Sequence, residues 1–247
     1  TNVSFEGPAL KGATNAVLPR VDHRETSFSP TAFEATYRFI TGKSAQLLAI
    51  QPETPVVLNG KATGLGLQPA DPASGNYSNN LALPGAQVAV YATDAATGAR
   101  LGNAIHTKTV GADGLWGPFT AQAGVPYEFV ISAQGYAITH IYRSPFPRSS
   151  NIIHLRADRP AEADKGAKSS VTLTRPRGYF DATRDRMQFD GKALPGVPPK
   201  GAGVSSSKIN LGQDGIRPIS AEFNGEKITG RTWPVAGNHL VVLELTD

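Results

Sequence analysis

One histidine, His23, lies in a polar loop directly ahead of a short helical pattern. Its neighbours in that loop are Arg20, Asp22, Arg24 and Glu25. An imidazole in such a loop can take a proton from a serine hydroxyl and return it to a leaving group, with a carboxylate fixing its tautomer. His23 is therefore a candidate catalytic residue, and the alternative is an ordinary surface-loop histidine.

The rest of a serine-hydrolase constellation is missing from the sequence. No G-x-S-x-G is present, because GATNA, GNYSN and GVSSS all fail that pattern. Asp22 is adjacent to His23 and is interpreted as structural, and Glu6 lies too close to the expected strand. If His23 is catalytic, we expect its serine and acid to lie upstream of Thr1, with ~200 or more residues there to complete a domain.

The remaining histidines lie in strand-like runs and are interpreted as structural or surface residues. No two of them have the spacing of a metal-binding H-x-x-x-H pair. The loop DPASGN, residues 71–76, has oxygens for calcium, but an ordinary turn explains it better. We therefore expect neither a metal nor a cofactor. These histidines are His106, His140, His154 and His239.

A short helix is predicted over residues 30–41. Ser29 suits the N-cap, Pro30 the first helical position, and Gly42 the stop. An apolar stripe follows at helical spacing, formed by Phe33, Tyr37 and Ile40. One such helix cannot bury its stripe alone, so that face must pack on something.

The chain after this helix reads as short strands and tight turns. The 26 Gly and 19 Pro are typical of many strands joined by turns. Residues 54–156 form one predicted β-sandwich, 157–169 a polar linker, and 170–247 a further β-domain. Residues 3–5 could be a short strand ahead of the histidine loop.

Composition excludes several classes of protein. With no cysteine in 247 residues, disulfides, thiolate chemistry and cysteine-based zinc sites are excluded. The net charge of +4 comes from singly scattered basic residues, so nucleic acid is not an expected partner. No stretch reaches the ~18 apolar residues of a membrane span. The opening TNVSFEG has no signal peptide, and a mature bacterial protein, secreted or periplasmic, is expected.

The histidine loop and helix resemble the end of the α/β-hydrolase fold, most closely in bacterial and archaeal lipases and esterases. Those proteins share N-x-x-L-P-x-x-D-H ahead of F-x-x-x-Y-x-F-x-x-G. The matching positions are Asn15, Leu18, Pro19, Asp22, His23, Phe33, Tyr37, Phe39 and Gly42. The resemblance covers about residues 1–42 and implies that residues 1–45 are the C-terminal end of an α/β-hydrolase domain, with His23 as the triad base. It also implies an ester or lipid substrate and an N-terminal hydrolase part of the same polypeptide as partner.

Residues 54–156 resemble a second family, the transthyretin-like or collagen-adhesin B-type sandwich. The shared positions are Gly85, Ala86, Val88, Val90, Asp113, Gly114, Phe119, Tyr127, Phe129, Gly135 and Tyr136. This resemblance implies a fold and little chemistry.

Two functions from different classes remain open. The first is the C-terminal portion of a secreted serine esterase or lipase, supplying His23 and β-domains near the substrate. The second is a non-catalytic β-module for adhesion, carbohydrate binding or spacing. In both, the expected fold is mainly β, with one or two antiparallel sandwich or barrel domains. In the first, the last strand, His loop and final helix of a hydrolase domain precede them.

Overall fold

The computed structural model describes residues 10–64, 81–200 and 202–246. The strand expected at residues 3–5 and the loop at 71–76 lie outside these ranges. The chain divides into two compact units, residues 1–49 and residues 50–247. Each unit is described by itself.

The first unit contains the predicted helix, with the predicted ends. Helix α1 (Pro30–Thr41) follows a short 3-10 helix, η1 (Glu25–Ser27). The Ser29 hydroxyl accepts a hydrogen bond from the amide of Ala32 at 3.1 Å, and Gly42 ends the helix with a φ of 70°. The prediction of this helix and of both of its caps is therefore confirmed.

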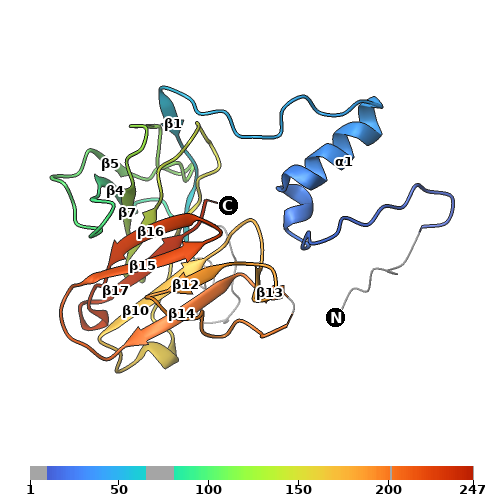
Figure 1. Cartoon of the computed structure of the whole chain (residues 1–247). Coiled ribbons are helices and arrows are strands. Elements are labelled where there is room, and N and C mark those ends of the chain that lie inside the picture. Colours follow the sequence, from blue (N-terminus) through green and yellow to red (C-terminus); the bar gives the residue numbers. More distant parts are fainter. Residues whose placement is uncertain (1–9, 65–80, 201, 247) are drawn as a thin grey trace. The chain divides into compact units, whose positions relative to one another are not determined.

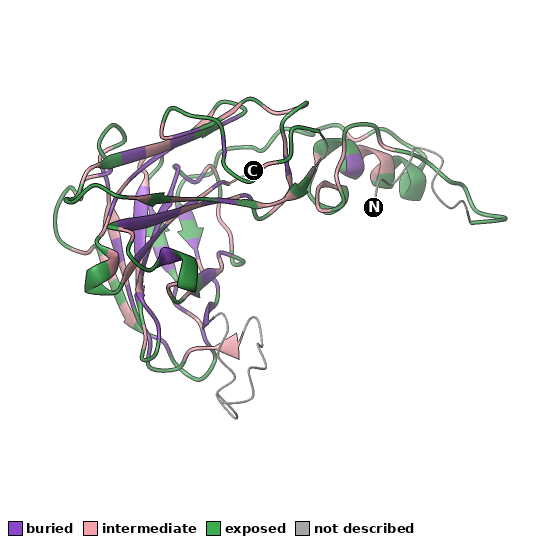
Figure 2. Cartoon of the chain, turned by 90° about the horizontal axis from the view of Figure 1, so that it is seen from below, coloured by how far each residue is buried: buried purple, intermediate pink, exposed green. Residues whose placement is uncertain are grey.

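The apolar face of α1 is not buried within the first unit. Ala32 is the helix's buried residue, while Phe33 is 52% exposed and Ile40 72% exposed. Figure 2 accordingly shows most of α1 in the colour of exposed residues. Further exposed apolar side chains lie in the same unit: Leu10, Val17, Phe28, Phe39, Leu47 and Leu48.

The second unit is built mainly of strands, so the predicted mainly β fold is confirmed. Among the described residues of this unit, two 3-10 helices lie between strands, η3 (Glu162–Asp164) and η4 (Val235–Gly237). The strands are β1 (Val56–Leu58), β2 (Ala62–Gly64), β3 (Leu81–Ala82), β4 (Gln87–Ala92), β5 (His106–Thr109), β6 (Phe119–Ala121), β7 (Tyr127–Ser132), β8 (Ile138–Arg143), β9 (Leu155–Ala157), β10 (Ser169–Thr174), β11 (Phe180–Asp181), β12 (Met187–Phe189), β13 (Ala202–Val204), β14 (Ser206–Leu211), β15 (Pro218–Phe223), β16 (Glu226–Arg231) and β17 (His239–Glu244).

A seven-stranded sheet runs through the unit in the order β14-β10-β17-β8-β7-β4-β5 (Figure 1). Strand β17 lies parallel to both of its neighbours, with Val241 opposite His140 of β8 and Val171 of β10. All other neighbouring pairs in this sheet are antiparallel. Residues 54–156 and 170–247 therefore contribute strands to the same sheet. The boundary at residues 157–169 stays a prediction.

The large sheet has an apolar core on each face. Successive residues of a strand point to opposite faces, and the two cores follow that rule. Ile141 and Val242 pack in the core that contains Trp116 and Phe129. Their neighbours in sequence, Tyr142 and Leu243, pack in the other core with β15 and β16.

The layer formed by β12, β15 and β16 approaches the sheet closely at one glycine. A Cβ atom added to Gly230 of β16 would lie 2.6 Å from Cδ2 of Tyr142 and 2.8 Å from Cδ2 of Leu243. Only a residue without a side chain fits there, so Gly230 sets how closely β16 packs on β8 and β17.

The predicted linker is tied to the sheet by one buried carboxylate. Asp164 is fully buried and accepts hydrogen bonds from Lys208 at 3.0 and 3.1 Å. Ser170 and Asn210 also donate to it, each at 3.2 Å, and the amide of Ala161 donates at 2.8 Å. These donors fix the connection between β9 and β10.

Candidate functional site

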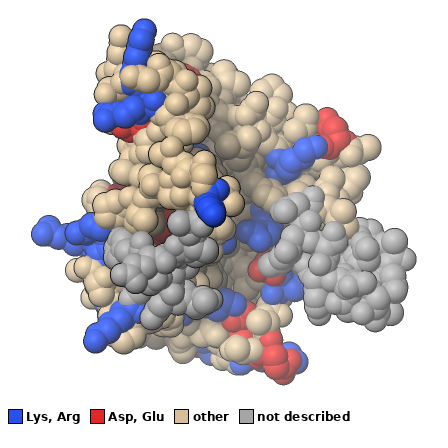
Figure 3. Space-filling model, turned by 90° about the vertical axis from the view of Figure 1, so that its right-hand side faces the viewer, with Lys and Arg blue, Asp and Glu red and all other residues tan. Residues whose placement is uncertain are grey.

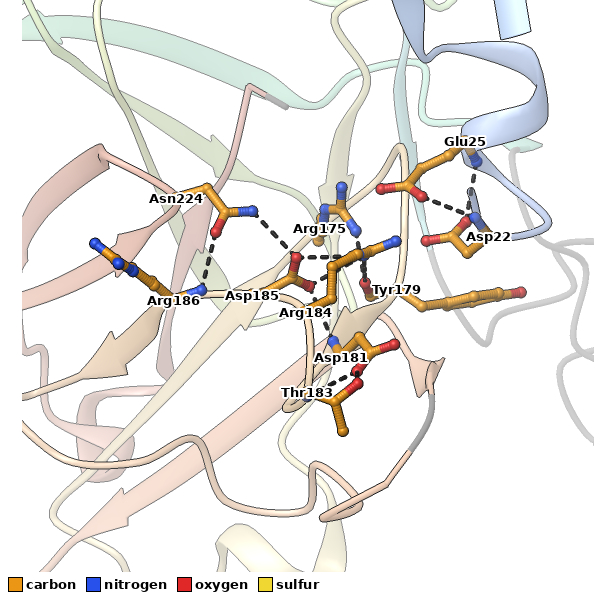
Figure 4. Close-up of polar contacts among 10 residues, drawn as sticks. All are labelled: Asp22, Glu25, Arg175, Tyr179, Asp181, Thr183, Arg184, Asp185, Arg186 and Asn224. Atoms are coloured by element: carbon orange, nitrogen blue, oxygen red, sulfur yellow. Dashed lines mark hydrogen bonds and ion pairs between the residues drawn. The ribbon is translucent and has the colours of Figure 1, made fainter. Parts of the chain in front are cut away.

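The loop around His23 is organised by the neighbouring Asp22. The Asp22 carboxylate accepts from the amides of Arg24 and Glu25 at 2.8 and 3.0 Å, and Glu25 accepts in return from the amide of Asp22 at 2.8 Å (Figure 4). This is the reciprocal arrangement of a capping box at the start of η1. The interpretation of Asp22 as structural is supported by these contacts.

His23 itself is presented on the surface of the first unit. Its residue is exposed, and its carbonyl accepts a hydrogen bond from the Thr26 hydroxyl at 2.6 Å. Within the described ranges, no serine or carboxylate forms a hydrogen bond with the His23 imidazole. The side chain can therefore act as a base only beside groups that the described residues do not bring to it.

A second cluster of ionisable side chains lies inside the other unit. Glu128 of β7 is fully buried, and its carboxylate lies 2.6 Å from Nδ1 of His140 on β8. Nε2 of His140 lies 2.9 Å from Nδ1 of His239 on β17. Arg100 closes the other end, donating to Glu128 at 2.6 and 3.1 Å. Arg100, Glu128, His140 and His239 are called the buried relay.

Burial and charge act in opposite directions on the relay. Burial alone would raise the pKa of Glu128, but hydrogen bonds from His140 and Arg100 outweigh it and hold that pKa below its usual value. Burial lowers the pKa of His140, although Glu128 opposes the shift. Burial, followed by the charges of His140 and Arg100, lowers the pKa of His239. Glu128 is thus ionised and both imidazoles are neutral at neutral pH.

Aromatic side chains enclose the relay. The Trp233 ring stacks on His140 with centroids 4.2 Å apart and planes 7° from parallel. Its indole N–H donates to the Tyr142 hydroxyl at 3.1 Å. The Arg100 guanidinium lies 3.8 Å from the centroid of the Tyr91 ring. This arrangement excludes water from Glu128 and His140 and leaves His239 half-buried.

No pattern in the sequence indicates this cluster. His140 and His239 are separated by 99 positions, and each lies in a run that reads as an ordinary strand. The parallel pairing of β17 with β8 brings them together, and such a pairing leaves no local pattern. From the sequence alone, both are interpreted as structural or surface histidines.

A third polar cluster stabilises the loop between β10 and β12 (Figure 4). Asp185 accepts from Arg184 at 2.8 and 3.0 Å and from the side-chain amide of Asn224 at 3.1 Å. Arg175 and Arg184 both donate to the carbonyl of Tyr179, at 2.5 and 3.0 Å. Because these carboxylate and guanidinium groups bind one another and the backbone, we interpret the cluster as structural.

The described residues contain no group of three or more His, Asp or Glu side chains arranged to hold a metal ion. Within the same ranges, no helix has the length and apolar character needed to cross a membrane. On the face shown in Figure 3, Lys and Arg side chains lie at several separate places, with acidic side chains between them. That nucleic acid is not a partner stays a prediction.

Comparison with known proteins gives one family match. Residues 54–160 match the family model of the lipase C-terminal domain. The matched range begins just before β1 and ends just after β9, so it includes Glu128 and His140 but not His239. The match supports a lipase-associated C-terminal domain in this chain. No curated protein matches the chain.

Solved structures show only weak likeness. A fimbrial protein from Bacteroides ovatus is 12% identical, with 81% of this chain and 52% of that chain covered and a TM-score of 0.24. The shaft pilin SpaA from Lactobacillus rhamnosus GG is 10% identical, with 78% and 98% covered and a TM-score of 0.27. This chain thus spans about half the length of the fimbrial protein.

Proposed function

We propose that this chain is the C-terminal part of an exported serine esterase or lipase, in which His23 is the general base. The observation that carries the proposal is the family match at residues 54–160, which directly follows the histidine loop and α1. A lipase-associated module placed after a loop and helix of the hydrolase type favours an ester hydrolase over an unrelated β-module.

The exposed face of α1 supports the same proposal. A helix with Phe33 and Ile40 more than half exposed is not stabilised by burial within its own unit. Burying a Phe or Ile side chain contributes ~1.5–3 kcal/mol of favourable free energy. Packing of a hydrolase sheet against this face would therefore be stabilising. The hydrolase part of the same polypeptide is the occupant we propose.

The chemistry then assigns one role to this chain. A serine on the hydrolase part would lose its proton to His23 as it attacks an ester carbonyl. His23 would return that proton to the departing alkoxide. Water would then attack the acyl-enzyme, with His23 again taking the proton and returning it to the serine oxygen as the acid product leaves. The exposed position of the His23 imidazole leaves it accessible to such a serine. The substrate is an ester of a lipid or polyester.

The test is the polypeptide from the complete reading frame, assayed on a short-chain aryl ester. His23→Gln should lower kcat/KM by ~10⁴-fold, because triad members act as a unit. It should change the melting temperature little, because His23 is exposed. His106→Gln is the matched control and should keep the rate, since Nε2 of His106 donates to the carbonyl of Trp116 at 3.0 Å, within the second unit.

Two results would refute the proposal. If His23→Gln kept more than about a tenth of the native rate, His23 would not be the base. If the full polypeptide neither hydrolysed the ester nor reacted with a fluorophosphonate that labels activated serines, the non-catalytic β-module would replace the esterase.

A further inference from the structure

The buried relay connects strands that are far apart in sequence. Glu128 and His140 belong to the range matched by the lipase C-terminal family, whereas His239 and Trp233 lie beyond it. The hydrogen bond between His140 and His239 is therefore a polar contact between that range and β17, an interior strand of the large sheet. Of the two histidines that form this hydrogen bond, His140 is buried and His239 is half-buried.

The protons of the relay follow from its acceptors. Because Glu128 is an ionised acceptor, Nδ1 of His140 must carry the proton that bridges them. Nε2 of a neutral His140 is then an acceptor, and Nδ1 of His239 must donate to it. This assignment leaves the lone pair of His239 on Nε2, for which the described residues offer no hydrogen-bond donor.

Each added proton has a distinct cost. The first would bind Nε2 of His239 and keep the hydrogen bond, but it would place a second positive charge near Arg100. The second would bind Nε2 of His140, where it would face the N–H of His239. Two donors cannot share one hydrogen bond, so the second proton must break the contact.

We propose that the His140–His239 hydrogen bond is an acid-sensitive contact that holds strand β17 against β8, and that proton uptake by this pair loosens β17. The titratable and charged groups that face the pair are Tyr91 on β4, Arg100 in the connection between β4 and β5, Glu128 on β7 and Tyr142 on β8. Arg100 opposes the added protons. Glu128 is already paired with Arg100 and accepts a hydrogen bond from Nδ1 of His140, so it offers limited compensation for further positive charge.

The direction of the pH effect follows from the lowered pKa values of both imidazoles. The unfolded chain binds these protons more readily than the folded chain, so stability falls as pH drops below the usual histidine value of about 6.5. The pKa of Glu128 is also lowered, from a carboxyl value, so its titration lies in a more acidic range. A change between pH 7 and pH 5 therefore reports on histidines.

The experiment is amide hydrogen exchange of the whole chain between pH 7 and pH 5, corrected for the exchange rates of an unstructured chain. At the amides of Val241 and Leu243 in β17, the equilibrium constant for opening should increase about tenfold for each pH unit of acidification and each proton bound. The corresponding increase at Val88 and Val90 of β4 should be at least threefold smaller. Equal increases in both strands would overturn the proposal, because they would indicate global unfolding.

Two variants separate the relay from other histidines. His239→Asn places an amide N–H near the position of Nδ1 and cannot titrate, so it should reduce the pH response of β17 to less than threefold. His106→Gln lies on edge strand β5, outside the relay, and should leave the response unchanged. A response that survives His239→Asn, or that disappears in His106→Gln, would refute the proposal.

A measurement on the unaltered protein covers the case in which His239→Asn does not fold. Nitrogen NMR of isotopically labelled histidine reports the protonation of each imidazole nitrogen. His140 and His239 should both carry the proton on Nδ1 at pH 8, and both should titrate below about 6.5. Titration of either above that value, or the opposite tautomer of His140, would overturn the proposal. All three readouts are independent of esterase activity.

Discussion

Buried carboxylates in this chain illustrate how single residues stabilise it. Asp164 has no exposed surface, and donors from the backbone, from Ser170, Lys208 and Asn210 surround it. A buried charge is tolerated when hydrogen bonds and an opposite charge replace its water. Asp164 thus holds the connection between β9 and β10 in one conformation.

Asp164→Asn should lower the free energy of unfolding by about 2–3 kcal/mol, because Lys208 loses its partner and one oxygen becomes an N–H donor facing other donors. The folded-state pKa of Asp164 is lowered, since its hydrogen bonds outweigh burial. Its contribution is therefore present at neutral pH and is lost as pH falls through the folded pKa.

Urea denaturation at pH 7 and pH 3 would test this prediction. Glu162→Gln is the control, because Glu162 pairs with Lys165 on the surface with 83% of its side chain exposed. We expect that control to change stability by less than ~0.5 kcal/mol. If Asp164→Asn behaved like the control at pH 7, the carboxylate would not stabilise the loop.

At the scale of elements, the packing of β16 on the large sheet depends on the missing side chain of Gly230. A methyl group there would meet the rings and methyls of Tyr142 and Leu243 inside normal contact distance. Well-packed cores respond to such insertions with shifted rotamers or backbone.

Gly230→Ala should therefore destabilise the unit by about 1–3 kcal/mol. Gly212→Ala is the matched control, since an added Cβ at Gly212 meets no atom within 4 Å and its φ is not positive. Thermal melts of the two variants would show a decrease for the first only. Equal melting temperatures would mean that β16 can move away from the sheet at little cost.

The elements that could be predicted from the sequence are those with local signals. Ser29, Pro30 and Gly42 mark the ends of α1 through capping chemistry within a few residues. The alternation in β7 and β8 predicts strands for the same reason. Partner strands, by contrast, depend on contacts between distant residues, so neither the insertion of β17 between β8 and β10 nor the buried relay was predicted.

The candidate base likewise combines a feature with a local signal in the sequence and a role that depends on distant residues. His23 and its loop were identified from sequence, and the capping role of Asp22 agrees with the structural interpretation of that residue. A catalytic role cannot be read from one histidine, because it depends on the serine and acid beside it. It therefore stays a proposal.

At the scale of the whole molecule, residues 50–247 have two cores on opposite faces of one sheet. The core around Trp116 and Phe129 is drawn almost wholly from residues 56–157, with Val242 packed against it. The other core includes Tyr142 from β8. Sharing β8 and β17 should couple the two cores.

Residues 50–247 alone should therefore unfold in one transition. Residues 50–160 alone should still fold, because they retain their core, but with lower stability, because β8 becomes an edge and Glu128 and His140 lose cover from Trp233. Calorimetry of both fragments would test this prediction. Two separate transitions in 50–247, or equal stability of the shorter fragment, would show that the cores are independent.

The central position of β17 has a consequence for synthesis. Both of its neighbours, β8 and β10, precede it in the chain, so they leave the ribosome earlier and wait without the strand that joins them. Until β17 arrives, each presents unpaired backbone groups and apolar side chains to other chains. The nascent polypeptide thus has an interval of exposure to aggregation that lasts until β17 is made, and chaperones that bind extended apolar strands would protect it then.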